Sequence, residues 1–570
     1  MLLRSAMPVA LVMGSGRAFR SRLVPAWVSV ASLARGGRSV SSTSCAASGA
    51  GATTDVDYCA TAVTRDLQPQ PLWKFFEEIS SIPRASKHEA AVLAYVKRFA
   101  GDRGLSWRED GYGNMVVDRA GMNGGESAAT VVIQGHVDMV TEKNAGSSHD
   151  FLTDPIRLLV EGDWLTADGT TLGADNGIGV SAALALLDLP ASSGVQLPPL
   201  ECLFTVEEEI GLVGAFELDG SMVKGRTMLN LDTVEWGSLF VGCAGGGDSL
   251  ITLPVEQETV DPGSYLPYSV AVEGLMGGHS GINIQEDRGN GVKLLIRVLE
   301  ALLEEVPSLR LVDLKGGDKH NAIPREAFAT ILLPKGDSAA LDAAKATANA
   351  IYDELKMEFG TKEPSLQVQI REDADAGVRV CLGEGAARRL LSLLELLPHG
   401  VMKISHDVEG LVETSSNLAS VTPIKAGGES GAGDPQGTYE ILCSTRSSLG
   451  PALEAVRRRI KKAAELCGAS DVLRRQAYPG WRPDLQSHAL KVAKDSLRVL
   501  LGGEEPGIEA LHAGLECGVI GDKAPGMDMV SFGPTIDGAH SPDERVHIES
   551  VGKFWQLVLA TLEGLAIEKK

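Results

Sequence analysis

Short apolar runs rich in β-branched residues alternate with longer helical patterns over much of this chain. The clearest runs are residues 130–133, 201–206, 227–231 and 529–532, and a helix-like stretch occupies residues 179–187. Strands that alternate with helices favour a mostly parallel sheet, because each crossover between parallel strands usually contains a helix. Helices then cover both faces of the sheet, which explains why its strands are apolar throughout. The pattern therefore predicts an α/β fold built on a mostly parallel sheet.

A second alternating pattern occupies residues 262–480. Its expected helices are residues 291–305, 338–359, 386–397 and 451–467, and its expected strands are residues 269–273, 328–333, 366–370 and 438–444. A Gly-rich stretch at 426–437 is expected to be a loop. We interpret this region as a second α/β domain inserted within the first. The predicted catalytic domain is therefore split into residues 70–255 and 481–570.

The length and charge of the chain exclude several classes of protein. Its 570 residues are too many for one ordinary core, since a domain commonly holds about 100–200 residues. No run of about 18 uncharged apolar residues is present to span a membrane. The formal net charge of −22 argues against nucleic acid, because phosphate backbones require a basic surface. We therefore expect neither nucleic acid nor a membrane as the main partner.

The N-terminal segment differs in composition from the rest of the chain. Residues 1–54 contain six Arg but no Asp, Glu or Lys. An Arg-rich, Ser-rich and acid-poor start is the signature of an organelle transit peptide. We therefore interpret residues 1–60 as a transit peptide and disordered linker, which would direct the protein to a mitochondrion or a plastid. A plain disordered tail and a secretory signal are weaker interpretations, and a cytoplasmic location is the alternative.

His136 and Asp138 directly follow the apolar run that begins at residue 131. In open α/β sheets, functional sites form just beyond the carboxyl ends of the strands. A metal-bound imidazole usually donates its other N–H to a carboxylate, and Asp138 is close enough along the chain to accept it. For this pair alone, a His–Asp hydrogen bond without any metal explains the pattern equally well.

Four further His, Asp and Glu residues follow other strands or turns in the same way. Glu209 comes just after one strand and Asp232 after another, a Gly-rich turn brings Asp175 to the start of a helix, and the last strand leads to His540. Each of them alone is more often a solvated loop residue. Because the strand ends meet at one edge of the sheet, we expect these side chains to lie close to His136.

Two His and three carboxylates form a mixed nitrogen and oxygen ligand set. Such a set suits Zn²⁺, with Mn²⁺ or Co²⁺ as alternatives, better than Mg²⁺ or a thiolate site. Five ligands exceed the needs of one tetrahedral ion, whereas two metals that share one carboxylate would use all five. Two metals about 3.5–4 Å apart can activate a bridging water and polarise a carbonyl. Glu208 would then act as general base, taking the water's proton and passing it to the leaving amine.

The same motifs resemble those of the M20 metallopeptidases. The likeness is greatest to the aminoacyl-histidine dipeptidase branch, also called cytosol nonspecific dipeptidase or the PepD type. It runs from about residue 70 to the C-terminus and is carried by residues 132–138, 170–179, 204–215, 229–233, 277–281, 321–327 and 533–544. Several motifs in the right order make the resemblance specific.

The resemblance implies a dinuclear zinc hydrolase with a catalytic domain and an inserted lid domain at 262–480. His136 and Asp232 would bind one metal ion. Glu209 and His540 would bind the other, and Asp175 would bridge the two. The resemblance leaves both a monomer and a homodimer open.

The resemblance also implies roles for residues around the metals. Asp138 would orient the first imidazole and Glu208 would be the general base. In the lid, His279 would polarise the substrate carbonyl, Asn321 would position the substrate and Arg446 would bind its carboxylate through a bidentate fork. A turn histidine and a structural ion pair are the alternatives for His279 and Arg446.

His512 and Glu516 also match the dipeptidase branch. Their segment would line the site near the substrate amine, with simple packing as the alternative. Residues 410–417 are likewise typical of that branch.

Three functions compete for this set of motifs. The first is a metal-dependent dipeptidase that hydrolyses short peptides, including Xaa-His dipeptides. The second is an M20-type amidohydrolase that acts on N-acyl amino acids, and residues 410–417 favour the first over the second. The third is a catalytically silent binding or scaffold protein, which would be expected to lack Glu208 or a metal ligand.

Overall fold

The computed structural model describes residues 63–373, 378–424 and 436–567. The expected transit segment at 1–60 and most of the expected loop at 426–437 lie outside these ranges. Within them, no helix combines the length and apolar character needed to cross a membrane.

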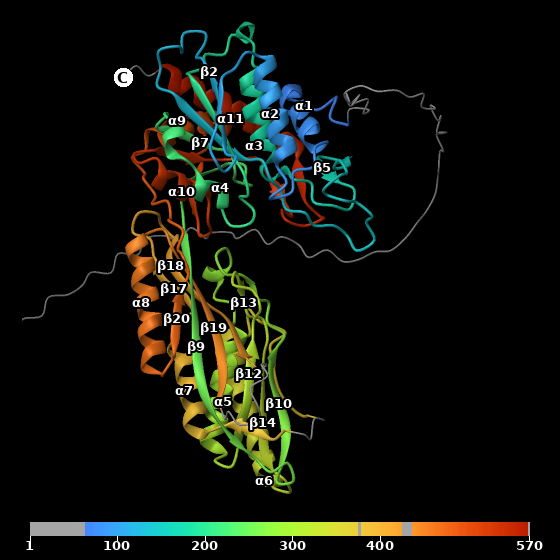
Figure 1. The fold of residues 1–570 in the computed structure, drawn as a ribbon, viewed down its shortest axis with the longest axis vertical. Coiled ribbons are helices and arrows are strands. Elements are labelled where there is room, and N and C mark those ends of the chain that lie inside the picture. Colours follow the sequence, from blue (N-terminus) through green and yellow to red (C-terminus); the bar gives the residue numbers. More distant parts are fainter. Residues whose placement is uncertain (1–62, 374–377, 425–435, 568–570) are drawn as a thin grey trace, which may run out of the picture. The chain divides into compact units, whose positions relative to one another are not determined.

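Eight strands form the first sheet in the order β1-β2-β6-β3-β7-β22-β8-β21 (Figure 1). The four central strands, β6, β3, β7 and β22, are parallel, whereas β1 and β2 pair antiparallel at one edge. The expected α/β sheet is therefore parallel at its centre and mixed toward its edges. Its strands are β1 (Trp107–Glu109), β2 (Met115–Arg119), β3 (Val131–His136), β6 (Leu200–Thr205), β7 (Thr227–Asn230), β8 (Ser238–Cys243), β21 (Gly507–Leu511) and β22 (Asp528–Ser531).

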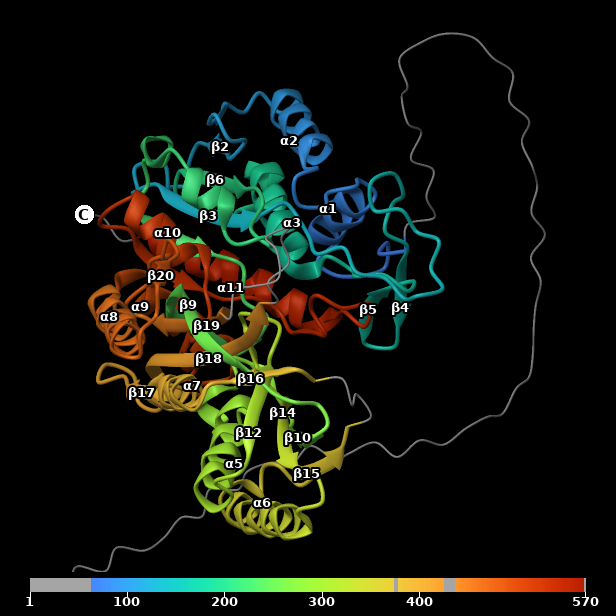
Figure 2. The ribbon, with the colours of Figure 1, turned by 60° about the horizontal axis from the view of Figure 1, so that its bottom comes forward.

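Apolar side chains on both faces of this sheet explain its continuous apolar strands. In β3, Val131 and Ile133 join a core that also contains residues of α1, α2, α3, α9 and α11, whereas Val132 joins a second core with α4 and α10. Helix α1 packs against α3, and α9 packs against α11 (Figure 2). The helices are α1 (Gln70–Ser80), α2 (Ala90–Asp102), α3 (Ala174–Asp188), α4 (Val213–Glu217), α9 (His488–Leu500), α10 (Glu516–Lys523) and α11 (Ile548–Ile567).

A second sheet of ten strands follows the order β15-β10-β14-β12-β18-β19-β9-β16, with β17 and β20 paired to β18 and β9. All of its pairings among the described residues are antiparallel. Its strands are β9 (Gly245–Thr259), β10 (Tyr265–Glu273), β12 (Arg310–Gly316), β14 (Ala327–Pro334), β15 (Gln367–Glu372), β16 (Val380–Leu382), β17 (Gly400–Ile404), β18 (Val412–Ile424), β19 (Gln436–Ser447) and β20 (Asp471–Arg474).

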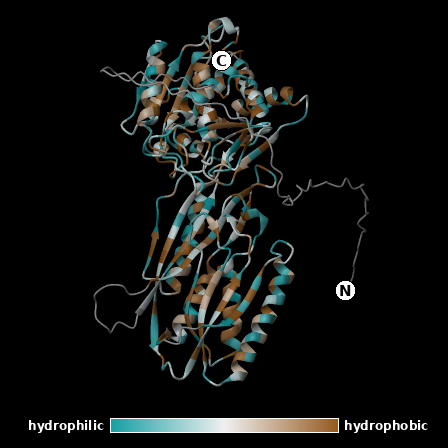
Figure 3. Cartoon of the chain, turned by 90° about the vertical axis from the view of Figure 1, so that its right-hand side faces the viewer, coloured by the Kyte–Doolittle hydropathy of each residue, from teal (hydrophilic) through white to brown (hydrophobic). Residues whose placement is uncertain are grey.

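Four helices share the core of the second sheet, and they lie where the sequence predicts them. In α6, Ala340, Ala344, Ala348 and Leu355 are buried, whereas Asp342 is exposed. Figure 3 shows that the helices of this part of the chain carry both hydrophilic and hydrophobic residues. Spacings of four residues place these alanines on one face of the helix, so a single stripe is enough to dock it. The helices are α5 (Gly291–Glu305), α6 (Ser338–Phe359), α7 (Glu384–Leu396) and α8 (Gly450–Leu466).

The first strand of the second sheet begins at Gly245, which precedes the predicted lid segment at 262–480. Strand β9 pairs along twelve consecutive residues with β19, and its residues alternate between buried and partly exposed. Such alternation is typical of an antiparallel strand with one face on the core. The division of the chain into a catalytic and a lid domain nevertheless stays our proposal.

Two small sheets and three short 3₁₀ helices complete the described fold. The four-stranded sheet has the order β23-β24-β5-β4, and β11 pairs with β13. These elements are β4 (Leu158–Glu161), β5 (Trp164–Ala167), β11 (Gly278–His279), β13 (Ala322–Ile323), β23 (Ile536–Asp537), β24 (Arg545–His547), η1 (Ala191–Ser193), η2 (Gly220–Met222) and η3 (Ile284–Glu286).

Candidate metal centre and active site

Three parallel strands of the first sheet end side by side at the candidate metal centre. Strand β3 ends at His136, Glu208 and Glu209 come soon after β6, and Asp232 comes just after β7. Because these strands are parallel neighbours, their carboxyl ends lie at the same edge of the sheet. The sheet therefore brings together side chains that are far apart in sequence.

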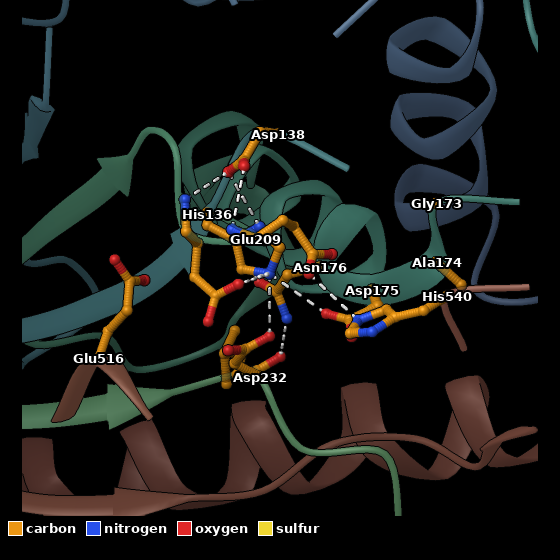
Figure 4. A network of polar contacts seen from close by, with 12 residues as sticks. His136, Asp138, Gly173, Ala174, Asp175, Asn176, Glu209, Asp232, Glu516 and His540 are labelled. Atoms are coloured by element: carbon orange, nitrogen blue, oxygen red, sulfur yellow. Dashed lines mark hydrogen bonds and ion pairs between the residues drawn. The ribbon is translucent and has the colours of Figure 1, made fainter. Parts of the chain in front are cut away.

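Asp175 and His540 reach the same place from outside the sheet. Asp175 is the second residue of α3, where its dihedral angles are not helical, and its peptide bond to Asn176 is cis. His540 lies in the loop between β23 and β24 with a φ of 64°. Figure 4 shows both side chains among those of the strand ends.

The two carboxylate oxygens of Asp175 face two different imidazoles (Figure 4). Its Oδ1 lies 3.2 Å from His136 Nε2, and its Oδ2 lies 3.4 Å from His540 Nε2. Asp232 Oδ1 is 3.3 Å from His136 Nε2, and Glu209 Oε2 is 3.1 Å from His540 Nε2. Asp175 is therefore the shared member of two adjacent groups, each with one His and two carboxylates.

The donor atoms of these two groups are close enough to surround metal ions. In each group one ligand atom per residue lies within 4.8 Å of the others, and a third group joins His136 to Glu208 and Glu209. Glu209 Oε1 and Asp232 Oδ1 are buried and have no hydrogen-bond partner among the described residues. Buried oxygens without hydrogen-bond partners, arranged around imidazole nitrogens, fit a divalent cation.

The pKa shifts of the residues in the cluster also favour a bound cation. Burial raises the pKa of Asp232 to about 8 and raises that of Glu208 well above its usual range. Burial opposes a charged His136, yet the nearby Asp232 and Glu208 carboxylates hold its pKa well above the ordinary value. Ion-pair hydrogen bonds to Asp175 and Glu209 raise the pKa of His540 to about 11. A cation among these groups would stabilise the ionised carboxylates and the neutral imidazoles that metal binding requires.

Asp138 contacts other groups besides the imidazole of His136. Its Oδ1 lies 3.3 Å from His136 Nδ1 and accepts the backbone N–H of Glu208 at 3.1 Å. Its Oδ2 accepts the backbone N–H of Glu209 at 3.2 Å and the hydroxyl of Ser86 at 2.7 Å. Asp138 therefore fixes an imidazole and both glutamates at once, a role that the sequence pattern alone did not indicate. Nothing in the sequence marked Ser86.

A fully buried arginine, Arg84, lies behind the cluster. Its guanidinium donates to the backbone oxygens of Val137 and Asp138 at 3.1 and 3.0 Å, and also to that of Gly173. Burial lowers its pKa, while Glu544 is the nearby carboxylate that most opposes this effect. Arg84 therefore ties the end of β3 to the turn that carries Asp175.

Glu544 holds that turn from the other side. Its carboxylate is 2% exposed and accepts the backbone N–H groups of residues 172–175 at distances of 2.8–3.3 Å. No sequence pattern indicated a role for Glu544, although it is the last residue of the 533–544 motif. Arg84 could not be predicted either, because a surface arginine and a buried one have the same sequence signature.

His279 lies in β11, which pairs with β13 so that His279 faces Ala322. Its Nδ1 accepts the backbone N–H groups of Gly281 and Ile282 at 3.2 and 3.1 Å. A nitrogen that accepts two N–H groups carries no proton, so the neutral ring must carry its proton on Nε2. Burial lowers the pKa of His279 to about 4, which keeps the ring neutral near pH 7. His279 can therefore donate one hydrogen bond from Nε2.

Asn321 lies beside His279. The backbone oxygen of Asn321 accepts the N–H of Ser280 at 2.8 Å, and Asn321 and His279 line a cavity of about 870 Å³. Lys315 and Arg325 line the same cavity. The structure thus brings two of the lid residues singled out from the sequence to one cavity.

Arg446 and His512 form a second pair of buried groups. Arg446 is 6% exposed, and its guanidinium donates to Tyr478 Oη at 3.0 Å, while its Nε has no partner among the described residues. His512 Nε2 is 2.7 Å from the hydroxyl of Ser415, a residue that faces Arg446 across β18 and β19. Burial lowers the pKa of His512 to about 3. No carboxylate of the described chain pairs with Arg446, which leaves it free to bind an anion.

Glu516 begins α10 and is completely buried. Its Oε2 accepts hydrogen bonds from Thr205 and Gln134, whereas its Oε1 has no partner among the described residues. Burial raises its pKa to about 7. Glu516 thus lies at the β6 end of the cluster with one free oxygen.

Known proteins share both this sequence and this fold. The cytosol non-specific dipeptidase of Escherichia coli is 40% identical over 499 residues, which cover 88% of this chain and 98% of that protein. The aminoacylhistidine dipeptidase of Vibrio alginolyticus has a solved structure with 39% identity and a TM-score of 0.77, covering 89% of this chain and 98% of that one. The aminopeptidase PepT of Bacillus cereus shares the fold at 16% identity and a TM-score of 0.52, over 88% of this chain and 99% of that one.

The sequence model of the Peptidase family M20/M25/M40 matches residues 132–564. This range includes all the strand ends described above and the whole of the second sheet. The chain therefore belongs to the peptidase family M20/M25/M40.

Proposed function

We propose that this enzyme is a metal-dependent dipeptidase, which hydrolyses the peptide bond of short peptides with free termini, including Xaa-His dipeptides. The observation that carries the proposal is Asp175, whose two oxygens serve two adjacent His-and-carboxylate groups. The E. coli and V. alginolyticus relatives, both named as dipeptidases, support the same activity.

Two divalent cations, Zn²⁺ with Mn²⁺ or Co²⁺ as alternatives, fit the paired groups and would polarise the substrate carbonyl and activate a water. His136 and Asp232 would hold one cation. Glu209 and His540 would hold the other, and Asp175 would contact both. The assignment is supported by the strand ends, the turn at Asp175 and the loop that carries His540, which bring the donor atoms of each group within 4.8 Å of one another.

Glu208 is the proposed general base. Its Oε2 lies 3.9 Å from His136 Nε2, at the edge of the cluster, and Asp138 holds its backbone N–H. It takes a proton from the attacking water as the oxygen bonds to the carbonyl carbon. When the C–N bond breaks, Glu208 passes this proton to the leaving amine nitrogen.

His279 and Arg446 are the proposed substrate contacts in the lid. The Nε2–H of His279 donates to the carbonyl oxygen, where negative charge grows during attack. Arg446, a buried guanidinium with an unpartnered Nε, binds the carboxylate of the dipeptide. Asn321 positions the peptide beside His279.

His512 and Glu516 are proposed to lie at the substrate's amino end. The free oxygen of Glu516 would accept a hydrogen bond from the substrate ammonium, and the segment that carries both residues would line this end of the site. A site that contacts both termini accepts dipeptides and excludes long chains.

The second candidate is an amidohydrolase that acts on N-acyl amino acids. The metal cluster serves both reactions, but an N-acyl amino acid has no ammonium for Glu516. The named dipeptidases among the relatives and the residues 410–417 favour the dipeptidase. A silent scaffold is disfavoured because the proposed base and all five proposed ligands are present.

The deciding experiment is a hydrolysis screen of dipeptides, tripeptides and N-acyl amino acids with added Zn²⁺, Mn²⁺ or Co²⁺. We expect dipeptides to give the highest kcat/KM and a chelator to abolish the activity. Preference for N-acyl amino acids would establish the second candidate. Full activity of a protein shown to be metal-free would overturn both.

Residues 1–60 are proposed to act as a mitochondrial or plastid transit peptide, and the cytosolic name of the E. coli relative supports the cytoplasmic alternative. Fluorescent fusions of the full chain and of a chain lacking residues 1–60 separate the two. Loss of organelle signal on truncation supports the transit peptide, and an identical diffuse signal from both supports the cytoplasm.

A homodimer is likewise a proposal, tested by light scattering of the purified protein.

A further inference from the structure

A row of polar side chains crosses three of the parallel strands one layer below the proposed metal ligands, and it ends at Thr205 on the fourth strand, which is paired with His136. The row consists of Thr205 on β6, Gln134 on β3, Asn230 on β7 and Ser531 on β22, and Glu516 of α10 joins it at one end. All five side chains are completely buried. Strand pairing places Gln134 beside Asn230, and Asn230 beside Ser531.

The hydrogen bonds of this row all run in one direction. Ser531 donates to Asn230 Oδ1, Asn230 Nδ2 donates to Gln134 Oε1, and Gln134 Nε2 donates to Glu516 Oε2. Thr205 accepts from Gln134 at 3.2 Å and donates to Glu516 Oε2 at 2.7 Å. With both amides in this orientation, their N–H groups point toward Glu516, and one carboxylate oxygen can accept from both Gln134 and Thr205.

The row is directly connected to the proposed metal ligands. Gln134 and His136 are two residues apart on β3, so their side chains point to the same face of the sheet. Asn230 Oδ1 also accepts the backbone N–H of Asp232 at 3.3 Å. The row is thus one layer beneath two ligands that belong to the same proposed metal group.

Stability alone gives little reason for such a row. Buried amides and hydroxyls cost free energy unless they are paired, and apolar side chains occupy the neighbouring positions of the same strands. Paired amides and hydroxyls on neighbouring strands instead favour one register of the strands, because a shift would leave them without partners.

We propose that Gln134 and Asn230 are positioning residues of the active site. Through the row they hold the strand ends that carry His136 and Asp232 in register. They also orient Glu516 so that its Oε1 stays free of protein donors. This inference rests on the proposed metal site.

Competition for Zn²⁺ with a chromogenic chelator tests the inference on the protein itself, without substrate. Asn230→Leu removes both amide functions at similar volume, and we expect a 10–100-fold loss of Zn²⁺ affinity. Thr205→Val keeps the shape of the side chain and removes one donor to Glu516, so it should fold even if Asn230→Leu does not. We expect Thr205→Val to raise the KM for a dipeptide at least threefold with a smaller change in kcat.

Thr561→Val is the matched control. Thr561 is completely buried in α11, and its hydroxyl has no partner among the described residues. Its replacement should change Zn²⁺ affinity and KM less than twofold. Folded Asn230→Leu with wild-type Zn²⁺ affinity would overturn the ligand-positioning role, and unchanged KM in Thr205→Val would overturn the role toward Glu516. Because Zn²⁺ affinity is measured without substrate, a failure of the proposed dipeptidase activity would be recognised separately.

Discussion

Gly281 lies against the backbone carbonyl of His512 so closely that a Cβ on Gly281 would stand 2.3 Å from that oxygen. Gly281 belongs to the turn that carries His279, whereas His512 follows the edge strand β21 of the first sheet. The turn of His279 therefore docks on the part of the chain that carries the proposed metal ligands only because residue 281 has no side chain.

Gly281→Ala should therefore displace His279 and lower kcat/KM about tenfold or more, since small misplacements of catalytic groups are costly. Steady-state kinetics on a dipeptide measures the effect. Gly385→Ala is the control, because in α7 the nearest atom to an added Cβ is 3.8 Å away. Equal kinetics for both variants would show that the contact does not position His279.

Glu208→Ala should lower kcat about 10²–10⁴-fold while metal binding persists, because it removes the proton acceptor but none of the five proposed ligands. Metal content and kcat are measured on the same preparation. Glu207→Gln provides the control, since among the described residues the Glu207 carboxylate accepts a hydrogen bond only from the exposed Tyr112 hydroxyl, at 3.1 Å. A Glu208→Ala variant with near-normal kcat would rule out the proposed base.

Asp175→Ala should abolish tight binding of both metals, whereas Asp232→Ala should leave one metal per chain. The reason is that Asp175 contacts both imidazoles and Asp232 only His136. Elemental analysis after dialysis gives the stoichiometry. Equal metal content in the two variants would mean that Asp175 is not shared.

Glu544→Gln should lower the free energy of unfolding by about 1–3 kcal/mol, because an amide N–H₂ would face backbone N–H groups that now donate to a carboxylate. Zn²⁺ affinity should fall with it, since Asp175 depends on that turn. Denaturant titration and chelator competition measure the two effects. Glu549→Gln, an exposed change that loses only a pair with Lys553, should stay within about 0.5 kcal/mol.

His512 should make the fold less stable in acid. Burial lowers its pKa to about 3, so between that value and about 6.5 the unfolded chain binds a proton that the folded chain does not. The free energy of unfolding therefore falls as the pH drops below 6.5, by at most about 1.4 kcal/mol per pH unit from this residue. Denaturant titrations at pH 7 and pH 5 should show a smaller difference for His512→Gln than for the wild type. All other titrating groups are common to the wild type and the variant, so the comparison isolates the contribution of His512. An equal change in the free energy of unfolding between pH 7 and pH 5 in the two proteins would contradict the prediction.

The strands and helices near the site could be predicted because their sequence patterns are local. The apolar run before His136 and the helix over residues 291–305 are found where the sequence places them. The carboxyl ends of parallel neighbouring strands lie at the same edge of a sheet. The grouping of His136 with Asp232 could therefore be predicted from the sequence.

Other features depend on partners that no local pattern identifies. Arg84 and Glu544 each act on a turn far away in sequence, and their burial follows from packing rather than from residue type. Strand β9 alternates in burial because Ile251, Leu253 and Val255 face a core that distant strands and helices complete.

The sequence by itself determined which residue types follow each strand, and therefore the chemistry available at the sheet edge. Tertiary structure alone decided that Asp175 has one oxygen for each imidazole, that Asp138 holds both glutamates, and that the buried row ends at Glu516. The physical reason is the range of the interactions. Strand and helix patterns arise from residues that are neighbours along the chain. Hydrogen-bond direction and steric fit, as between Gly281 and His512, exist only once distant segments are in contact.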